Sequence, residues 1–208
     1  ISRSTPGRSR RNLANTVRSG PAVRNILLDA LPDQYQGWLI RTDFRIGVQI
    51  AQAFEDVDLS PQEAYATALR LLFGRSVPPP ETAMAALQWF MRGGKEPQPS
   101  AGSGAKETPR GFDFDYDDGR IYSAFRRAYG IDLHRERLHW FAFLHLMSDL
   151  GDCALTQIAH YRTADLSKMG EQERKAYEQM RKRYAIPEAI SQEDQRVIAE
   201  FMAQLEGG

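Results

Sequence analysis

Apolar residues recur at intervals of three and four along most of the chain, which is the pattern of helices with one buried face. Residues typical of helix starts and helix ends divide the chain into separate helices. Ser60-Pro61-Gln62-Glu63, for example, combines a cap, a first-turn proline and a capping-box glutamate. In chain order, helices are predicted to begin at Thr42 or Asp43, at Ser60, after Pro80, at Asp117 or Asp118, at Asp132, near Leu155, near Gly170 and at Ser191–Asp194. The expected stops are Gly74, Gly93-Gly94, Gly130, Gly151 and Pro187.

Residues 26–42 are the one good candidate for strands. Leu31-Pro32-Asp33 predicts a turn, and Gln36-Gly37 suits the turn of a hairpin between β-forming residues. Residues 112–118 alternate aromatic and acidic side chains, which predicts a one-sided strand or an extended segment. The expected fold is therefore mainly α, a compact multi-helix domain with a small N-terminal β-hairpin and a flexible central linker.

The linker is predicted at residues 93–111, which contain Gly, Pro, Ser, Lys and Glu but no large apolar side chain. It could separate two subdomains or form a mobile loop inside one domain. We favour the loop, because each half is small for a stable core of its own. The expected organisation is a basic flexible tail at 1–25, a helical domain at 26–187 and a C-terminal amphipathic helix at 188–208.

Net charge is zero only by cancellation, because 27 Lys and Arg balance 27 Asp and Glu. Residues 1–25 hold six arginines and no acid, so the rest of the chain has 21 bases against 27 acids. The segment has the composition of a solvated tail and also resembles an organelle transit peptide. Phosphate binding by its arginines is an alternative, although no aromatic residue is interleaved with them.

Composition and motifs exclude several classes of protein. The single cysteine, Cys153, rules out a disulfide scaffold, and no uncharged apolar run approaches the ~18 residues of a membrane span. His134 and His139 would lie about 140° apart on a helix and do not converge on a metal. The acidic run at 113–117 has alternate aspartates but lacks the glycine and final glutamate of a calcium loop. Without a catalytic motif, we expect no enzyme, cofactor or metal.

A family resemblance appears in the order of several short segments. They are Thr42-Asp43-Phe44-Arg45, Trp89-Phe90-Met91-Arg92-Gly93-Gly94-Lys95, Phe112-Asp113-Phe114-Asp115, Ile121-Tyr122-Ser123-Ala124-Phe125, Tyr129-Gly130-Ile131-Asp132-Leu133, Leu138-His139-Trp140 and Tyr161-Arg162-Thr163-Ala164-Asp165-Leu166-Ser167. In this order they resemble the bacteriophage gp-fifteen family, small proteins of phage and prophage tail modules. The resemblance covers about residues 26–187. It implies a non-enzymatic tail assembly chaperone, because the family's usual gene position is between the major tail protein and the tape-measure protein.

The implied partner is the tape-measure protein, a long helix whose apolar stripes are exposed before the tail tube forms. The major tail protein and a second copy of the chain are further possible partners, in the cytoplasm of the bacterial host and with no membrane. We do not expect nucleic acid as a partner. A nucleic-acid-binding phage protein that uses the Arg-rich tail, or a minor structural tail component, remains the alternative. Candidate partner-binding residues are Trp89, Phe90, Met91, Phe112, Phe114 and Tyr116, with core packing as the competing interpretation.

Overall fold

The computed structural model describes residues 26–95, 109–189, 191, 192, 194 and 196. A two-stranded antiparallel hairpin, β1 (Gln34–Tyr35) and β2 (Trp38–Leu39), precedes the helices. The α-helices of the described residues are α1 (Phe44–Glu55), α2 (Pro61–Phe73), α3 (Pro80–Met91), α4 (Asp118–Tyr129), α5 (Trp140–Ser148), α6 (Ala154–Thr163) and α7 (Glu171–Arg183). A short 3-10 helix, Leu166–Lys168, precedes α7. The expected mainly helical fold with a small hairpin is confirmed.

The hairpin turn is made by two residues with positive φ. Gln36 has φ of 48° and Gly37 has φ of 85°, which is the conformation that matches the twist of a tight hairpin. The predicted Gln36-Gly37 turn is therefore confirmed. Tyr35 is buried beneath it, with its ring centroid 5.1 Å from that of Trp89 on α3. The hairpin thus closes one end of the core.

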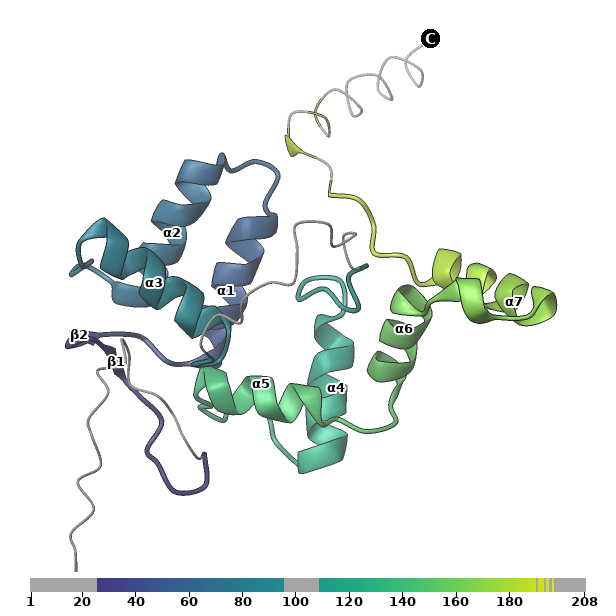
Figure 1. Ribbon diagram of the computed structural model, residues 1–208, viewed down its shortest axis with the longest axis horizontal. Helices are drawn as coiled ribbons and strands as arrows, with labels where there is room; N and C mark the ends of the chain where they lie inside the picture. The colour runs from purple at the N-terminus through teal and green to yellow at the C-terminus, as the bar shows by residue number, and fades with distance from the viewer. Residues whose placement is uncertain (1–25, 96–108, 190, 193, 195, 197–208) are drawn as a thin grey trace, which may run out of the picture.

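Two groups of helices flank α5. Figure 1 shows α1, α2 and α3 on one side and α4, α6 and α7 on the other, with α5 lying between them. The core runs through both groups as a set of buried aromatic rings. Its largest fully buried aromatic side chains are Trp140, Phe90, Phe125, Phe141 and Phe143. Phe90 comes before residues 96–108 and the others come after them, so one core joins both halves of the chain.

A glycine lets α1 approach α5 closely. The indole of Trp140 lies against Gly47, in the middle of α1, and a Cβ built at this glycine would be 2.3 Å from the ring. Glycine in a helix interior costs about 1 kcal/mol relative to alanine. Here the missing side chain leaves room for the indole of Trp140, which is buried with only 2% of its surface exposed.

Local helix signals are confirmed at several boundaries. The Asp43 carboxylate accepts the Arg45 N–H at the start of α1, and Ser60 and Glu63 form the expected capping box on α2. Gly74 ends α2 by donating its N–H to the Arg70 carbonyl, and Gly130 ends α4 in the left-handed conformation. These boundaries are set by neighbouring residues, which is why the sequence predicts them.

The long helix expected from Asp132 to Gly151 is wrong. Residues 132–139 form turns and extended chain, and α5 begins only at Trp140. The reason is a bridge to the start of α1: the Phe44 N–H donates to the Leu138 carbonyl and the Trp140 N–H donates to the Thr42 carbonyl, at 2.9 and 2.7 Å. This pairing holds the backbone extended, and His139 then caps α5 through the Phe141 N–H.

The strand or extended segment expected at residues 112–118 is also wrong. Residues 114–117 form a turn, because the Asp113 carboxylate accepts the N–H groups of Asp115 and Tyr116 at 2.8 and 2.7 Å. Asp117 occupies the N-cap position of α4, but its side chain makes no capping hydrogen bond. That carboxylate is used elsewhere, as described below.

Candidate functional site

The aromatic cluster before the linker belongs to the core. Trp89 is 6% exposed and Phe90 is fully buried, while Met91 is half-buried and packs against the same cluster. Core packing, the competing interpretation, therefore describes Trp89 and Phe90 in this structure. Their helical spacing directs them inward, where the ring of Trp89 meets that of Phe141 edge to face.

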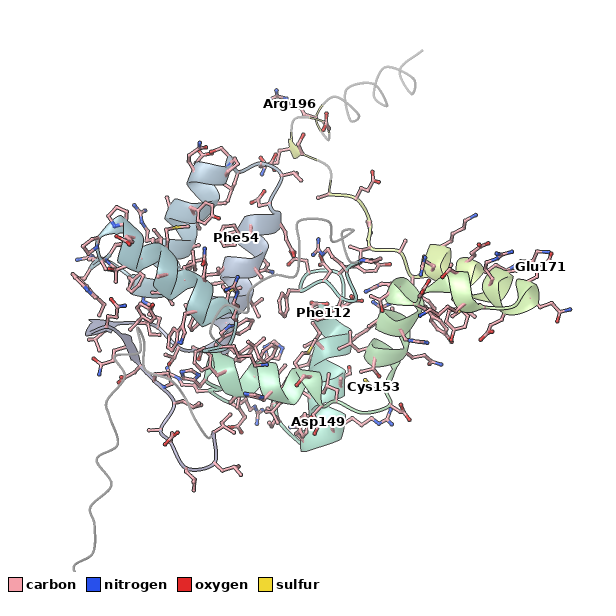
Figure 2. The ribbon with its side chains drawn as sticks, viewed as in Figure 1. Phe54, Phe112, Asp149, Cys153, Glu171 and Arg196 are labelled. Carbon is pink, nitrogen blue, oxygen red and sulfur yellow. The ribbon has the colours of Figure 1, made fainter. Side chains whose placement is uncertain are left out.

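The aromatic residues after the linker have a different environment. Phe112 and Tyr116 are 36% and 40% exposed, and Phe114 is half-buried against Trp140 and Phe143. Phe112 packs edge to face on Phe114 with centroids 5.3 Å apart. We call residues 112–117 the aromatic loop. Figure 2 labels Phe112 on this loop, at the N-terminal end of α4.

The aromatic loop is anchored by a buried ion pair. Asp117 is fully buried and Arg162, on α6, is 4% exposed. The guanidinium donates to both carboxylate oxygens and also to the carbonyls of Gly111 and Tyr184, at 3.0 and 2.6 Å. Arg120 donates to the same carboxylate at 2.7 Å. One arginine therefore joins the loop to α6 and to the chain after α7.

The charge of Asp117 is maintained by these partners. Burial raises the pKa of the carboxyl, but hydrogen bonds from Arg162 and from the Asp113 N–H, the charge of Arg162 and the hydrogen bond from Arg120 outweigh it. The pKa of Asp117 is therefore lowered. An ionised carboxylate at this position keeps all the donors around it satisfied.

An apolar pocket lies on one side of the aromatic loop. Its cavity volume is about 350 Å³, and the half-buried ring of Phe114 forms part of its wall. Arg45, Asp118 and His134 provide the polar part of the lining. The remaining lining residues are Phe44, Val48, Gly119, Ile121, Tyr122, Leu133 and Phe143. The pocket suits an apolar side chain in size and chemistry.

A second, larger hollow contains Tyr116. It has a volume of about 860 Å³ and lies between the C-terminal half of α1, the following loop and the aromatic loop. Its apolar residues include Ala53, Val57, Leu59, Leu71 and Tyr116, and its acidic residues are Glu55, Asp56, Asp58, Asp113, Asp115 and Glu188. We call this hollow the acidic groove. Arg110 is the one cation among the described residues that line it.

The carboxylates of the acidic groove are only partly neutralised. Arg110 donates to Glu55 at 2.5 Å and to Asp113 at 2.6 Å. Burial raises the pKa of Glu55, the charge of Arg110 opposes it, and the charges of Asp113 and Asp115 raise it further. The net result is a raised pKa. Among the described residues that line the groove, negative charge therefore exceeds positive charge.

Sequence reasoning missed most of the acidic groove. Its residues come from three stretches that are far apart in the sequence: α1 to α2, residues 110–116 and the segment after α7. Helical spacing places Phe54, on the last turn of α1, on the same face as Phe44 and Ile50, yet it is 42% exposed and meets Tyr65 edge to face. Figure 2 labels Phe54 on α1. The sequence contains one signal for the groove, the acidic run Glu55-Asp56-Val57-Asp58 directly after Phe54.

Neither a metal-ligand cluster nor a membrane-spanning helix occurs among the described residues. Within the described ranges, His, Cys, Asp and Glu side chains form no group of three or more that could hold a metal ion. No helix in that part of the chain is long and apolar enough to cross a membrane. The Arg-rich segment 1–25, the middle of the linker and most of the predicted last helix lie outside the described residues.

Comparison with known proteins gives one match. The sequence model of a family described as Bacteriophage Gp15 protein matches residues 27–186. These residues include the aromatic loop, both residues of the buried ion pair and all the helices listed above. Neither the curated proteins nor the solved structures include a match.

Proposed function

Because the chain belongs to the Bacteriophage Gp15 protein family, we propose that this phage protein is a non-enzymatic tail assembly chaperone that binds the tape-measure protein. The observation that carries the proposal is the aromatic loop, which presents Phe112 and Tyr116 at the surface beside two hollows. A chaperone of this kind needs exposed apolar side chains next to cavities that accept the apolar residues of its client.

The rigidity of the aromatic loop supports a binding role. Exposed aromatic side chains bind best when their backbone is already held in the bound conformation, because less entropy is then lost on binding. Here the Asp113 carboxylate fixes the turn from inside, and the Asp117–Arg162 pair fixes its end. Phe112 and Tyr116 are therefore exposed on a fixed loop.

The apolar pocket supports the same role. Its lining is largely aromatic and aliphatic, and its volume of about 350 Å³ exceeds that of one large side chain. An amphipathic helix that lies along a surface inserts one or two anchor side chains into such pockets. A tape-measure helix with apolar stripes offers these anchors.

Co-expression tests the proposal. The tape-measure protein encoded in the same phage tail module is expressed in bacteria with and without this chain, and its soluble fraction and co-purification are measured. We expect the chain to raise the soluble yield of the tape-measure protein and to co-purify with it. Unchanged solubility together with no co-purification would exclude the chaperone.

A structural component of the tail is the competing function. Mass spectrometry of purified virions separates the two, because a chaperone leaves the particle after assembly whereas a structural component stays at stoichiometric level. We expect no peptides of this chain in purified particles. Stoichiometric recovery would favour the structural component instead.

A further inference from the structure

A segment of the chain itself forms one wall of the acidic groove. Ile186, Pro187, Glu188 and Ala189 are among its lining residues, and farther along the chain the Gln192 N–H donates to the Asp58 carboxylate at 2.9 Å. We call residues 186–189 the C-terminal strap. Figure 1 shows the chain after α7 returning toward the loop between α1 and α2.

Most of the strap is exposed. Ile186 is half-buried, whereas Pro187, Glu188 and Ala189 are exposed. Hydrogen bonds flank it on both sides, from Arg162 Nε to the Tyr184 carbonyl before it and from the Gln192 N–H to the Asp58 carboxylate after it. An exposed segment with no regular structure opens at low free-energy cost.

The charge of the strap does not complement the groove. No Lys, Arg or His occurs between Arg183 and Arg196, and Glu188 adds a further carboxylate to the groove lining. Five carboxylates of the body line the same hollow, with Arg110 as their cation. A cationic segment would gain favourable interactions that the strap cannot make.

We propose that the acidic groove is the docking surface for a cationic amphipathic segment of the client, and that the C-terminal strap, which forms one wall of the groove in the free chain, is displaced on binding. The proposal rests on the proposed function for the identity of the client. The apolar residues of the segment would take the place of Ile186 and Pro187 along Val57, Leu59 and Leu71. Its Lys or Arg side chains would pair with the groove carboxylates. The family match ends at residue 186, so the strap lies beyond the matched region except for Ile186.

Fluorescence anisotropy with two synthetic peptides tests the docking surface on the full chain. Both are 20-residue amphipathic helices with leucines on one face; one has lysines on the polar face and the other has glutamates. We expect only the lysine peptide to bind, more weakly as salt is raised. The variant E55Q/D56N/D115N removes three groove charges and keeps hydrogen-bond acceptors in place, so it should weaken binding about tenfold. The matched control E171Q/E173Q/E178Q removes three charges on α7 and should bind as the parent does.

Two measurements test the strap. Ile186→Ser removes its half-buried apolar contact without changing charge, so the open fraction rises and the lysine peptide should bind about fivefold tighter. In the unaltered chain, hydrogen exchange of the amides of Ile186, Ala189 and Gln192 should speed up when the peptide is added, since the Gln192 N–H leaves Asp58. Unchanged exchange, or binding that E55Q/D56N/D115N does not weaken, would overturn the proposal. Either result leaves the co-expression test of the chaperone standing, and a failed co-expression leaves the peptide results standing.

Discussion

The guanidinium of Arg162 donates hydrogen bonds to both carboxylate oxygens of Asp117, from Nη1 to Oδ2 at 2.5 Å and from Nη2 to Oδ1 at 3.2 Å. Both side chains are buried. The pair spans 45 positions of sequence and joins the start of α4 to the end of α6. Through the carbonyls of Gly111 and Tyr184 it also fixes the aromatic loop and the beginning of the strap. The stability of the candidate site therefore depends on one ion pair.

Asp117→Asn should strongly destabilise the protein. The substitution keeps the shape but leaves the charge of Arg162 buried without its counter-ion, and breaking one side of a buried pair costs about 3–5 kcal/mol. Urea denaturation at neutral pH measures the loss. Asp118→Asn is the matched control, because the neighbouring carboxylate is exposed, and it should change the free energy of unfolding by less than about 0.5 kcal/mol. Equal effects of the two substitutions would contradict a structural role for the pair.

The same pair predicts a dependence on acid. The folded pKa of Asp117 lies below its unfolded value of about 3.9, so its stabilising contribution is complete above that pH and is lost as pH falls through the folded pKa. The difference in unfolding free energy between the parent and Asp117→Asn should therefore shrink as pH falls from about 5 to below 3. A constant difference would contradict the lowered pKa.

Gly47→Ala should destabilise the fold, although alanine is the better helix former. The new Cβ would lie 2.3 Å from the Trp140 ring, and such overpacking in a core costs about 1–3 kcal/mol or more. Gly119→Ala in α4 is the control, because a Cβ there meets nothing within 4 Å. That change should be neutral or stabilise by about 0.5–1 kcal/mol. Thermal unfolding followed by circular dichroism compares the two; a stable Gly47→Ala protein would show that Trp140 can move.

His139 should make stability depend on pH near neutrality. Its Nδ1 accepts the Phe141 N–H, so Nε2 carries the proton and donates to the Pro32 carbonyl at 3.0 Å, which is the neutral form. Burial lowers the pKa of His139, while the Pro32 hydrogen bond and the charge of Asp33 raise it to a smaller extent. The ring is thus a neutral link between α5 and the turn before the hairpin.

Because the folded pKa of His139 is below its unfolded value of about 6.5, its contribution is complete above that pH and is lost as pH falls through the folded pKa. Between about pH 7.5 and 5, the urea midpoint of the parent should fall more than that of His139→Asn, which keeps a capping oxygen but does not titrate. Identical profiles for the parent and His139→Asn would show that another group titrates.

The fold could be predicted from the sequence where the deciding contacts are local. The Ser60–Glu63 capping box and the Gln36-Gly37 turn are each set within four residues, and both were expected. The helix expected from Asp132 was wrong because a backbone bridge from Thr42 and Phe44 extends the chain up to Trp140. The spacing of apolar residues gives no information about a backbone hydrogen-bond partner that lies more than ninety positions away in the sequence.

In the candidate site too, features set by local contacts could be predicted, whereas features set by distant contacts could not. The sequence predicts Asp117 or Asp118 as the cap of α4, but the Asp117 carboxylate pairs with Arg162 instead. The sequence contains no local signal for that pairing. Phe112 and Tyr116 resemble Trp89 and Phe90 in composition, yet only the first pair is exposed. The difference arises because Trp89 and Phe90 lie on a helix that packs against α5, whereas the turn around Asp113 leaves Phe112 and Tyr116 outside. The acidic groove needs three separate segments and becomes visible only when they meet.

The double substitution Phe112→Ser and Tyr116→Ser should abolish client solubilisation while leaving the fold intact. Both side chains are more than a third exposed, so their loss should lower the free energy of unfolding by only about 1 kcal/mol. Binding should suffer far more, because exposed aromatic anchors beside a cavity carry a large share of interface energy. We expect the soluble yield of the co-expressed tape-measure protein to fall to the level seen without this chain.

Leu39→Ser is the matched control for that experiment. Leu39 is 73% exposed on β2, so its substitution also removes surface apolar area, but from the hairpin and away from the aromatic loop. A thermal melt of each variant confirms that it is folded before yields are compared. If a general apolar surface were responsible for holding the client, the control would lose as much solubilising activity as the double variant. Loss in the double variant alone places the contact at the aromatic loop, where the Asp117–Arg162 pair holds the backbone in position.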